Sequence, residues 1–319
     1  MPFSLHPLLA ADAPRVTEII NRDYPEQASV EEVRERIVGA GHPDRSILRL
    51  GAEDEAGALI GYGHAMRDNW MEPGLFWVRI VVEPGARQQG AGRQLHEAVQ
   101  SFACEHGATW LRGEVRDHLP EGMAFAQAVG YAVERHIFES TLSVAGFDER
   151  PFLAALEAAE AKGIRFFSLA DVGDTREARE RLWALERTVA LDVPGGSEAS
   201  IRPFDVWEQQ VAHSGHYLAE GQLIAAHDDE WIGMAALLDY PENETMYHGI
   251  TGVLPAWRGR GVATALKALT IRLARARGVK ILRTNNDAEN APMLAVNRKL
   301  GYQPEPGYYR LVAHLHAGE

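Results

Sequence analysis

Short runs rich in apolar residues recur in two groups along the chain. Each group has three runs with the length and the β-branched or aromatic content typical of strands. The polar turns DEAG and DDE join the first two runs of the two groups, so each group predicts an antiparallel meander. The six predicted strands are SILRLGAE, ALIGYGHAM and LFWVRIVVE in the first group, and QLIAAHD, WIGMAALLD and MYHGITGVL in the second.

Helical segments surround each meander. The halves open with ADAPRVTEIINRDYP and VGDTREARERLWALERTVALDVP, and Asp12 is a plausible N-cap of the first segment, with Pro14 in its first turn. Each half then continues through a second helix, the meander, a loop, a helix, a strand, a helix and a strand. This order predicts an α+β fold in which a mostly antiparallel mixed sheet is flanked by helices.

The two halves are copies of one another. Pro84, Arg87, Gly90 and Gly130 have counterparts at Pro255, Arg258, Gly261 and Gly301, and the differences 255−84, 258−87, 261−90 and 301−130 are all 171. A constant offset over this distance indicates a duplicated unit. We therefore predict an N-terminal domain over 1–145, a helical connector over 146–163 and a C-terminal domain over 164–319.

Composition narrows the class of protein. The net charge of −13 and the pI near 5.5 argue against binding to nucleic acid or to an anionic membrane. No apolar run approaches 18 residues and the first residues lack the features of a signal peptide, so we expect a cytoplasmic protein. Cys104 is the single cysteine, which excludes an internal disulfide, and its helical context QSFACEHG predicts a buried side chain. No metal site is predicted.

Each third strand leads into a glycine-rich loop, ARQQGAGRQLH (86–96) in the first half and WRGRGVATALK (257–267) in the second. Glycines let the backbone approach a ligand closely, and the free N–H groups at the start of the next helix favour an anion. The P-loop spacing is absent, and an antiparallel meander is not the βαβ unit of a Rossmann fold. The alternative to an anion-binding loop is a structural turn whose arginines are solvated. This alternative does not explain well why the same loop occurs twice at a constant offset.

The two loops and the residues that follow them resemble the GNAT superfamily of acyl-CoA-dependent N-acetyltransferases. Its signature [Q/R]-x-x-G-x-[G/A] matches Arg87–Gly92 and Arg258–Ala263, and its later Asn and L-G-[F/Y] elements match Asn290 and Leu300-Gly301-Tyr302. The resemblance covers both halves, so the chain resembles a tandem GNAT protein. Its architecture and length are similar to those of mycothiol synthase, although the catalytic positions differ.

The resemblance implies acetyl-CoA as cofactor, bound by the strand before each loop and by the loop itself. The implied residues are Thr251, Gly252, Val253, Arg258, Gly259, Arg260, Gly261, Val262, Ala263, Thr264 and Asn290 in the second half, and Val82, Arg87, Gln88, Gln89, Gly90, Ala91, Gly92 and Arg93 in the first. Asn290 is also a plausible helix N-cap.

Acetyl transfer to an amine requires that the amine lose a proton and that the oxyanion and the thiolate be stabilised. Counting along the strand places Tyr247 at the family's base position, and strand alternation turns His248 to the opposite face, where a structural role is expected. Glu242 and Glu244 lie in an acidic loop. Asn297 stands where the family often has a tyrosine; it can donate a hydrogen bond to sulfur but cannot supply a proton.

The first half has Phe76, Leu119 and Ala126 at the positions of Tyr247, Asn290 and Asn297, and none of these three can do this chemistry. We therefore expect an acyltransferase whose C-terminal domain moves an acetyl group to a primary amine of a small molecule. The N-terminal domain is expected to be catalytically degenerate. The alternatives are a non-catalytic acyl-CoA-binding or sensing protein and a protein or peptide N-acetyltransferase. We expect no nucleic-acid or membrane partner, and a monomer or homodimer.

Overall fold

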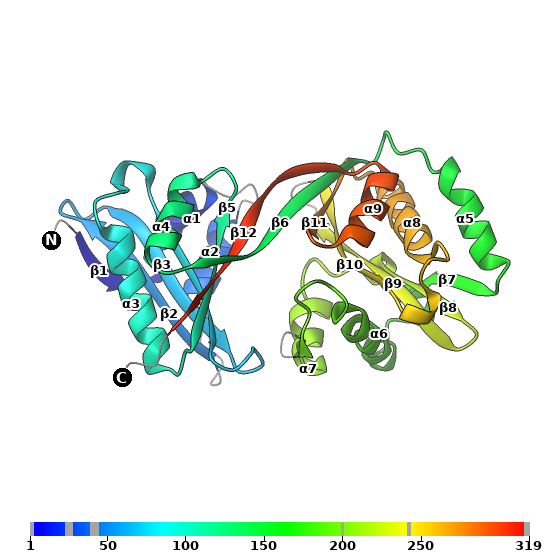
Figure 1. The fold of residues 1–319 in the computed structure, drawn as a ribbon, viewed down its shortest axis with the longest axis horizontal. Coiled ribbons are helices and arrows are strands. Elements are labelled where there is room, and N and C mark those ends of the chain that lie inside the picture. The colour runs from blue at the N-terminus through cyan, green and yellow to red at the C-terminus, as the bar shows by residue number, and fades with distance from the viewer. Residues whose placement is uncertain (1–2, 23–27, 39–44, 199–200, 241–243, 316–319) are drawn as a thin grey trace. The chain divides into compact units, whose positions relative to one another are not determined.

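The computed structural model describes residues 3–22, 28–38, 45–198, 201–240 and 244–315. The chain folds into two compact units, the first made of Met1–Arg135 with Tyr308–Glu319 and the second of His136–Gly307. Each unit has a mixed sheet with helices on both faces (Figure 1), which is the α+β architecture predicted from the sequence.

The strand order in the first unit is β1-β2-β3-β4-β5-β12, and every pair is antiparallel except the parallel pair β4–β5. Its strands are β1 (Phe3–Pro7), β2 (Arg45–Asp54), β3 (Leu59–Asp68), β4 (Leu75–Val82), β5 (Trp110–Arg116) and the end of β12 (Gln303–His314). Its helices are α1 (Ala13–Asn21), α2 (Val30–Val38), α3 (Ala91–Glu105) and α4 (Pro120–Ala128).

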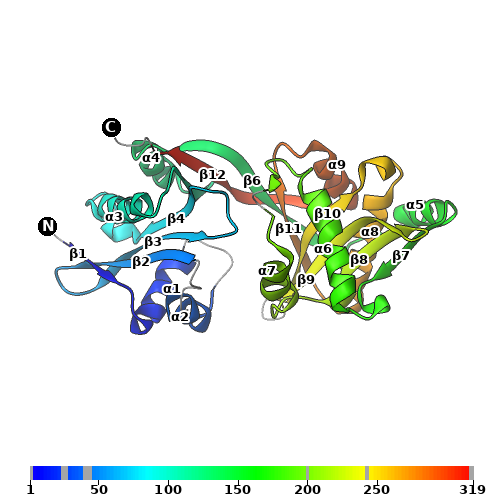
Figure 2. The ribbon, with the colours of Figure 1, turned by 90° about the horizontal axis from the view of Figure 1, so that it is seen from below.

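The two faces of this sheet are covered by different helices (Figure 2). Tyr62 of β3 packs with the apolar stripes of α1 and α2. A Cβ at Gly61 or Gly63, the neighbours of Tyr62 on β3, would contact Leu95 of α3. Because successive residues of a strand face opposite sides, these small residues allow α3 to lie close against the other face.

The second unit repeats this arrangement in the strand order β6-β11-β10-β9-β8-β7, with β10–β11 as its parallel pair. Its strands are β6 (Ala132–Ser143), β7 (Ile164–Ser168), β8 (Gln222–His227), β9 (Glu230–Tyr240), β10 (Thr245–Val253) and β11 (Ile281–Asp287). Its helices are α5 (Arg150–Glu160), α6 (Arg176–Ala190), α7 (Phe204–Trp207), α8 (Val262–Ala276) and α9 (Ala291–Leu300).

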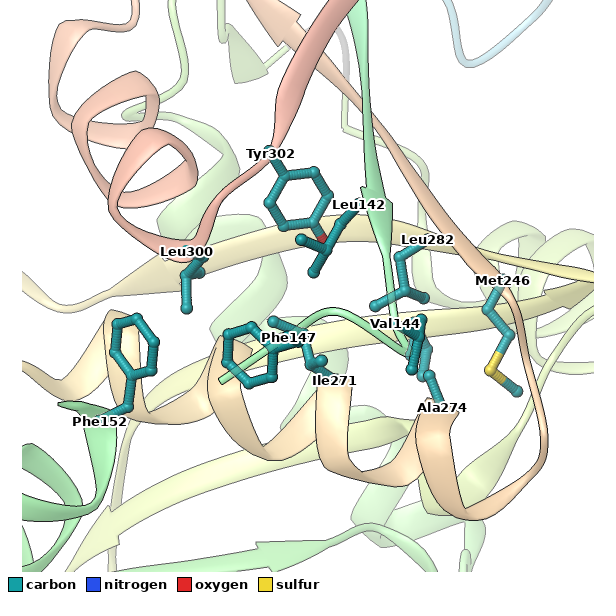
Figure 3. Packing of buried hydrophobic residues seen from close by; sticks show 11 residues of the cluster. Leu142, Val144, Phe147, Phe152, Met246, Ile271, Ala274, Leu282, Leu300 and Tyr302 are labelled. Atoms are coloured by element: carbon teal, nitrogen blue, oxygen red, sulfur yellow. The ribbon is translucent and has the colours of Figure 1, made fainter. Parts of the chain in front are cut away.

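The core on one face of the second sheet is built from segments far apart in sequence (Figure 3). Ile271 and Ala274 of α8 pack against Met246 of β10, Leu282 of β11 and Leu142 of β6. Leu142 comes from the first half of the sequence, so the second unit cannot complete this core with residues of its own half.

The last strands of the two halves are exchanged. Ile137–Ser143 of β6 pair with β11 in the second unit, while Tyr308–His314 of β12 pair with β5 in the first. The compact units therefore differ from the boundaries expected from the sequence, 1–145 and 164–319. The expected connector is helical over α5, and its Ala159 packs with Val262 and Leu266 of α8 as part of the second unit.

The six strands of the two meanders lie where the sequence predicts them, but β1 and β7 are additional edge strands that it did not predict. The predicted burial of Cys104 is wrong, because its side chain is exposed while the preceding Ala103 is buried. Among the described residues, no helix combines the length and the apolar character needed to cross a bilayer.

Candidate functional site

The glycine loop of the second unit ends at α8. Gly259 and Gly261 have φ of +73° and +83°, and Gly261 is the N-cap of α8. Residues that carry a side chain rarely adopt positive φ angles, which explains why glycine occupies these two positions. The first N–H groups of a helix have no acceptor inside it, so the amides that follow Gly261 are free to bind an anion.

The loop of the first unit has the same shape at a higher conformational cost. Gly90 has φ of +100° and is the N-cap of α3, but Gln88 has φ of +61° where the second loop has Gly259. A non-glycine residue in this region costs about 1 kcal/mol or more. The first loop is thus an intact but strained copy.

The first arginine of each motif holds its loop in place. Arg87 Nε donates to Val82 O at 2.9 Å, and Arg258 Nε donates to Val253 O at 3.0 Å. Their backbone N–H groups donate to Pro84 O and Pro255 O, both at 3.3 Å. Arg258 also forms an ion pair with Asp192. The loop amides available to an anion therefore begin one residue after each arginine.

The strands before the loops differ between the units. In β10 the pairing with β9 shifts between His248 and Thr251, so Gly249 and Ile250 have no partner across this ladder. A bulge of this kind leaves backbone groups unpaired and bends the strand. In β4 the pairing with β3 continues to Val82 without a shift. The bulge is therefore specific to the second unit.

The parallel pairing on the other side of β10 stops at the bulge. It runs from Thr245 to His248, opposite β11, and the pairing of β4 with β5 similarly stops at Trp77. Beyond these points the two strands separate. Thr251 follows the bulge, and its buried Oγ1 has no hydrogen-bond partner in the part of the chain that the structure describes.

Tyr247 and His248 were the residues considered for the base, and both side chains interact with neighbouring residues. The hydroxyl of Tyr247 accepts a hydrogen bond from Asn285 N at 3.2 Å. His248 is buried and its two ring nitrogens contact the Tyr302 and Thr270 hydroxyls. Burial lowers the pKa of His248 well below its usual value, with a smaller effect from the nearby Lys267 amine. His248 is therefore a neutral structural residue, in agreement with the expectation from strand alternation.

Asn297 belongs to a buried chain of polar side chains. Lys267 Nζ donates to Asn297 Oδ1 at 2.6 Å, and Asn297 Nδ2 donates to Asn286 Oδ1 at 2.5 Å. Asn286 Nδ2 in turn donates to Ser140 Oγ at 2.8 Å. Burial lowers the pKa of Lys267 to about 7. A hydrogen bond from Asn297 to a sulfur would require its bond to Asn286 to open.

Asn290 is an N-cap, because its Oδ1 accepts a hydrogen bond from Met293 N at 3.3 Å at the start of α9. Glu242 lies outside the described residues. Glu244 forms an ion pair with Lys280 at 2.5 Å, and both side chains are exposed.

The sequence analysis missed Glu186 of α6. Its carboxylate accepts a hydrogen bond from Trp207 Nε1 at 3.0 Å, and burial raises its pKa to about 7 despite this bond. One turn further along α6, Val189 lies directly against β10, since a Cβ at Gly252 would be 2.4 Å from Val189 Cβ. Residues three apart share a helix face, so Glu186 lies on the side of α6 that faces the sheet. A glutamate in a helix otherwise rich in charged residues gives no signal in the sequence.

The first unit contains a cavity of about 560 Å³. It lies between the separating ends of β4 and β5 and reaches the glycine loop, and its lining includes Val82, Arg87, Gly90 and Gly92. The volume is within the usual range for small-molecule sites. Leu119 and Ala126, which replace the two asparagines of the second unit, also line it, whereas Phe76 is buried in the core.

No group of three or more His, Cys, Asp or Glu side chains is arranged to hold a metal ion in the described ranges.

Comparisons with known proteins agree with this geometry. A family model described as the acetyltransferase (GNAT) family matches residues 13–131 and 194–302. The chain is 27% identical to the mycothiol acetyltransferase of Clavibacter michiganensis subsp. michiganensis over 275 residues, which cover 82% of this chain and 81% of that protein.

Solved structures share the whole fold. A GCN5-related N-acetyltransferase from Sphaerobacter thermophilus matches with a TM-score of 0.73 and 19% identity, covering 100% of this chain and 97% of that one. A tandem GNAT protein from the clavulanic acid biosynthesis pathway matches with a TM-score of 0.73 and 18% identity, covering 99% of this chain and 100% of that one.

Proposed function

Because the chain belongs to the GNAT acetyltransferase family, with two such domains in tandem, we propose that it moves an acetyl group from acetyl-CoA directly to a primary amine of a small molecule, with the chemistry in the second unit. Membership confirms the predicted family and the acyltransferase class, and the family uses acetyl-CoA as its donor. Relatives at about a quarter identity are named mycothiol acetyltransferases, which supports a small-molecule acceptor.

The observation that carries this proposal is the bulge in β10. It leaves Gly249 and Ile250 without partners in the β9 ladder, just before Thr251–Val253, whereas β4 of the first unit pairs with β3 without such a shift. Unpaired, fixed backbone N–H groups are the donors that stabilise a developing oxyanion. We propose the backbone N–H groups at this bulge as the donors for the reacting carbonyl, beside the loop proposed for the cofactor phosphates.

Acetyl-CoA, when bound, supplies the acetyl group as an activated thioester. The residues proposed to hold it are Thr251–Val253, the amides from Gly259 to Thr264, and Asn290. In the first unit the corresponding residues are Val82 and Gln88–Arg93.

We propose Glu186 as the general base on two grounds. It lies one turn along α6 from Val189, which packs against Gly252 of β10. Burial raises the pKa of its carboxyl to about 7, which suits it to accept a proton from an amine at neutral pH. Tyr247 is proposed to line the acceptor site, and Asn297 to hold Lys267 through the bond observed between them. In the first unit β4 pairs with β3 without such a shift, and Leu119 and Ala126 stand in place of the asparagines, so this unit is proposed to bind the cofactor without chemistry.

The test is acetyl-CoA-dependent release of free thiol on a panel of small amines, amino sugars and amino-acid conjugates, with peptides as a separate arm. Gly261→Trp is expected to lower kcat/KM at least 100-fold, and Gly90→Trp to leave more than half of the activity. Gly278→Trp, another positive-φ glycine beyond the far end of α8, is the matched control for backbone strain.

Loss of activity with Gly90→Trp alone would place the chemistry in the first unit. Turnover only with peptides would overturn the small-molecule acceptor. Saturable binding of acetyl-CoA with no turnover on either arm would favour a sensing protein.

A further inference from the structure

The cavity of the first unit is continuous from its glycine loop to its interior. Gln88, Gly90 and Arg93 line it at the loop, and Val115 and Ala126 line it between β5 and α4. One ligand that fills this cavity therefore has an anionic part, which suits the free amides at the start of α3, and a less polar part that extends inward.

Two buried polar side chains line this cavity without partners. His96 Nε2 and the Tyr131 hydroxyl have no hydrogen-bond partner among the described residues, and the two side chains are 4% and 8% exposed. Their rings are 5.7 Å apart, centroid to centroid, so they are neighbours in the wall. Burial lowers the pKa of His96, which makes its ring neutral near pH 7. A buried polar atom without a partner costs free energy, and a polar ligand atom removes this cost.

The second unit satisfies the same two positions internally. At the offset of 171, His96 corresponds to Lys267 and Tyr131 to Tyr302 (267−96 and 302−131). Lys267 donates to Asn297, and the Tyr302 hydroxyl contacts His248. The fold therefore allows side chains at these two positions to have hydrogen-bond partners, and the lack of partners for His96 and Tyr131 is particular to the first unit.

The walls beside them differ in polarity and size. Ala126 and Val115 stand where the second unit has Asn297 and Asn286, and Leu311 of β12 stands where it has Ser140 of β6 (311−140 is again 171). Three polar side chains that form a hydrogen-bonded chain in the second unit are thus replaced by three apolar ones. At Ala126 the side chain is also much smaller, which leaves room.

We propose that this cavity binds a coenzyme A thioester whose acyl chain is apolar and longer than acetyl, with His96 and Tyr131 as hydrogen-bond partners of the thioester region and Ala126, Val115 and Leu311 around the chain. The inference deepens the proposed function, because it rests on the first loop as a coenzyme A site. It assigns the two units different acyl groups.

The test is calorimetric titration of the full chain carrying Gly261→Trp, which blocks the second loop, with CoA, acetyl-CoA and hexanoyl-CoA. Each buried methylene contributes about a factor of four in affinity, so hexanoyl-CoA is expected to bind at least about tenfold more tightly than acetyl-CoA. Ala126→Asn, which restores the side chain of the second unit, is expected to abolish most of this preference and to leave the affinity for CoA unchanged. Retained CoA binding also shows that the variant is folded.

Ala128→Asn is the matched control, since Ala128 lies on the same helix, is exposed and does not line the cavity. Tyr131→Phe is expected to weaken thioester binding by about three- to tenfold relative to CoA.

Equal affinity for CoA, acetyl-CoA and hexanoyl-CoA would overturn the acyl assignment while leaving the first loop as a coenzyme A site. An acyl preference that persists in Gly90→Trp and disappears in Gly261→Trp would place it in the second unit. Absence of any binding in Gly261→Trp, with binding intact in Gly90→Trp, would overturn both the inference and the proposed first cofactor site.

Discussion

Lys267 is 1% exposed, although lysine is among the residues least often buried. Its amine donates to Asn297 and lies 5.0 Å from the centre of the Tyr302 ring, and burial lowers its pKa to about 7. In the unfolded chain the pKa is near 10.5. Between these two pH values the unfolded chain binds more protons than the folded one, so the free energy of unfolding rises with pH.

Lys267→Met is expected to remove this contribution, which is at most about 1.4 kcal/mol per pH unit. The free energy of unfolding of the natural chain should rise more steeply from pH 7 to pH 9.5 than that of the variant, as measured by urea titration at several pH values. Equal slopes for the two proteins would show that Lys267 is not protonated differently on folding.

Glu186→Gln is expected to lower kcat/KM about 100-fold, because the amide cannot accept the proton of the amine. The rate of the natural enzyme should rise with pH through about 7, as the carboxyl loses its proton, and the variant should lack this rise. Glu180→Gln, on the exposed side of the same helix, is the control. An unchanged pH profile in Glu186→Gln would exclude this carboxylate as the base.

These residues also show which side-chain environments could be predicted from the sequence. His248 was predictable, because strand alternation fixes the face of a side chain. The exposure of Cys104 was not predictable. One step along a helix turns a side chain by about 100°, and a short apolar run does not determine which residues of the helix face the core. Glu186 owes its pKa to the burial supplied by tertiary packing, which no local pattern contains.

At the scale of elements, the contact of α6 with β10 depends on Gly252. A Cβ at this position would be 2.4 Å from Val189 Cβ and within 3 Å of both of its methyl groups, so the helix must move if any side chain is added. Gly249, at the bulge of the same strand, is different: its Cβ would meet Ala236 at an ordinary 3.4 Å.

Gly252→Ala is therefore expected to destabilise the protein by about 1–3 kcal/mol, the usual cost of overpacking. Gly249→Ala is expected to cost much less. Urea unfolding of the two variants gives the comparison, and equal losses would contradict the packing argument.

The meander strands were predictable because each has a clear apolar run bounded by turn residues. β1 and β7 are only five residues long and lie at sheet edges, where the alternation is weak. The bulge in β10 was not predictable either, because it results from how two strands pair and not from the composition of one of them.

At the scale of the whole molecule, the exchange of β6 and β12 makes each unit depend on both halves of the sequence. Leu311 and Ala313 of β12 are core residues of the first unit, and Leu142 and Val144, at and just after the end of β6, are core residues of the second. The offset of 171 revealed the duplication but not the exchange. The two strands occupy equivalent places in the two repeats, so the offset between them is 171 whichever sheet each one joins. Only the three-dimensional pairing shows the exchange.

A chain that ends at Gly307 is expected to lose structure in the first unit only. Without its partner in β12, β5 should lose protection against amide hydrogen exchange, whereas β11, which pairs with β6, should keep it. Hydrogen-exchange mass spectrometry of the natural and truncated chains compares the two strands directly. Equal loss in β11 would contradict the exchanged pairing.

The exchange also bears on how the protein is made. The ion pair between Arg310 and Glu114 joins residues 196 positions apart. Across the β5–β12 ladder the separation runs from 192 (Tyr308 and Arg116) to 204 (His314 and Trp110). During synthesis the first unit is therefore without β12 until residues 308–314 leave the ribosome, while β6 is made before the rest of the sheet of the second unit. N-terminal domains usually fold first during synthesis. Here we expect the second unit to complete its sheet before the first unit does, because the first unit receives β12 last.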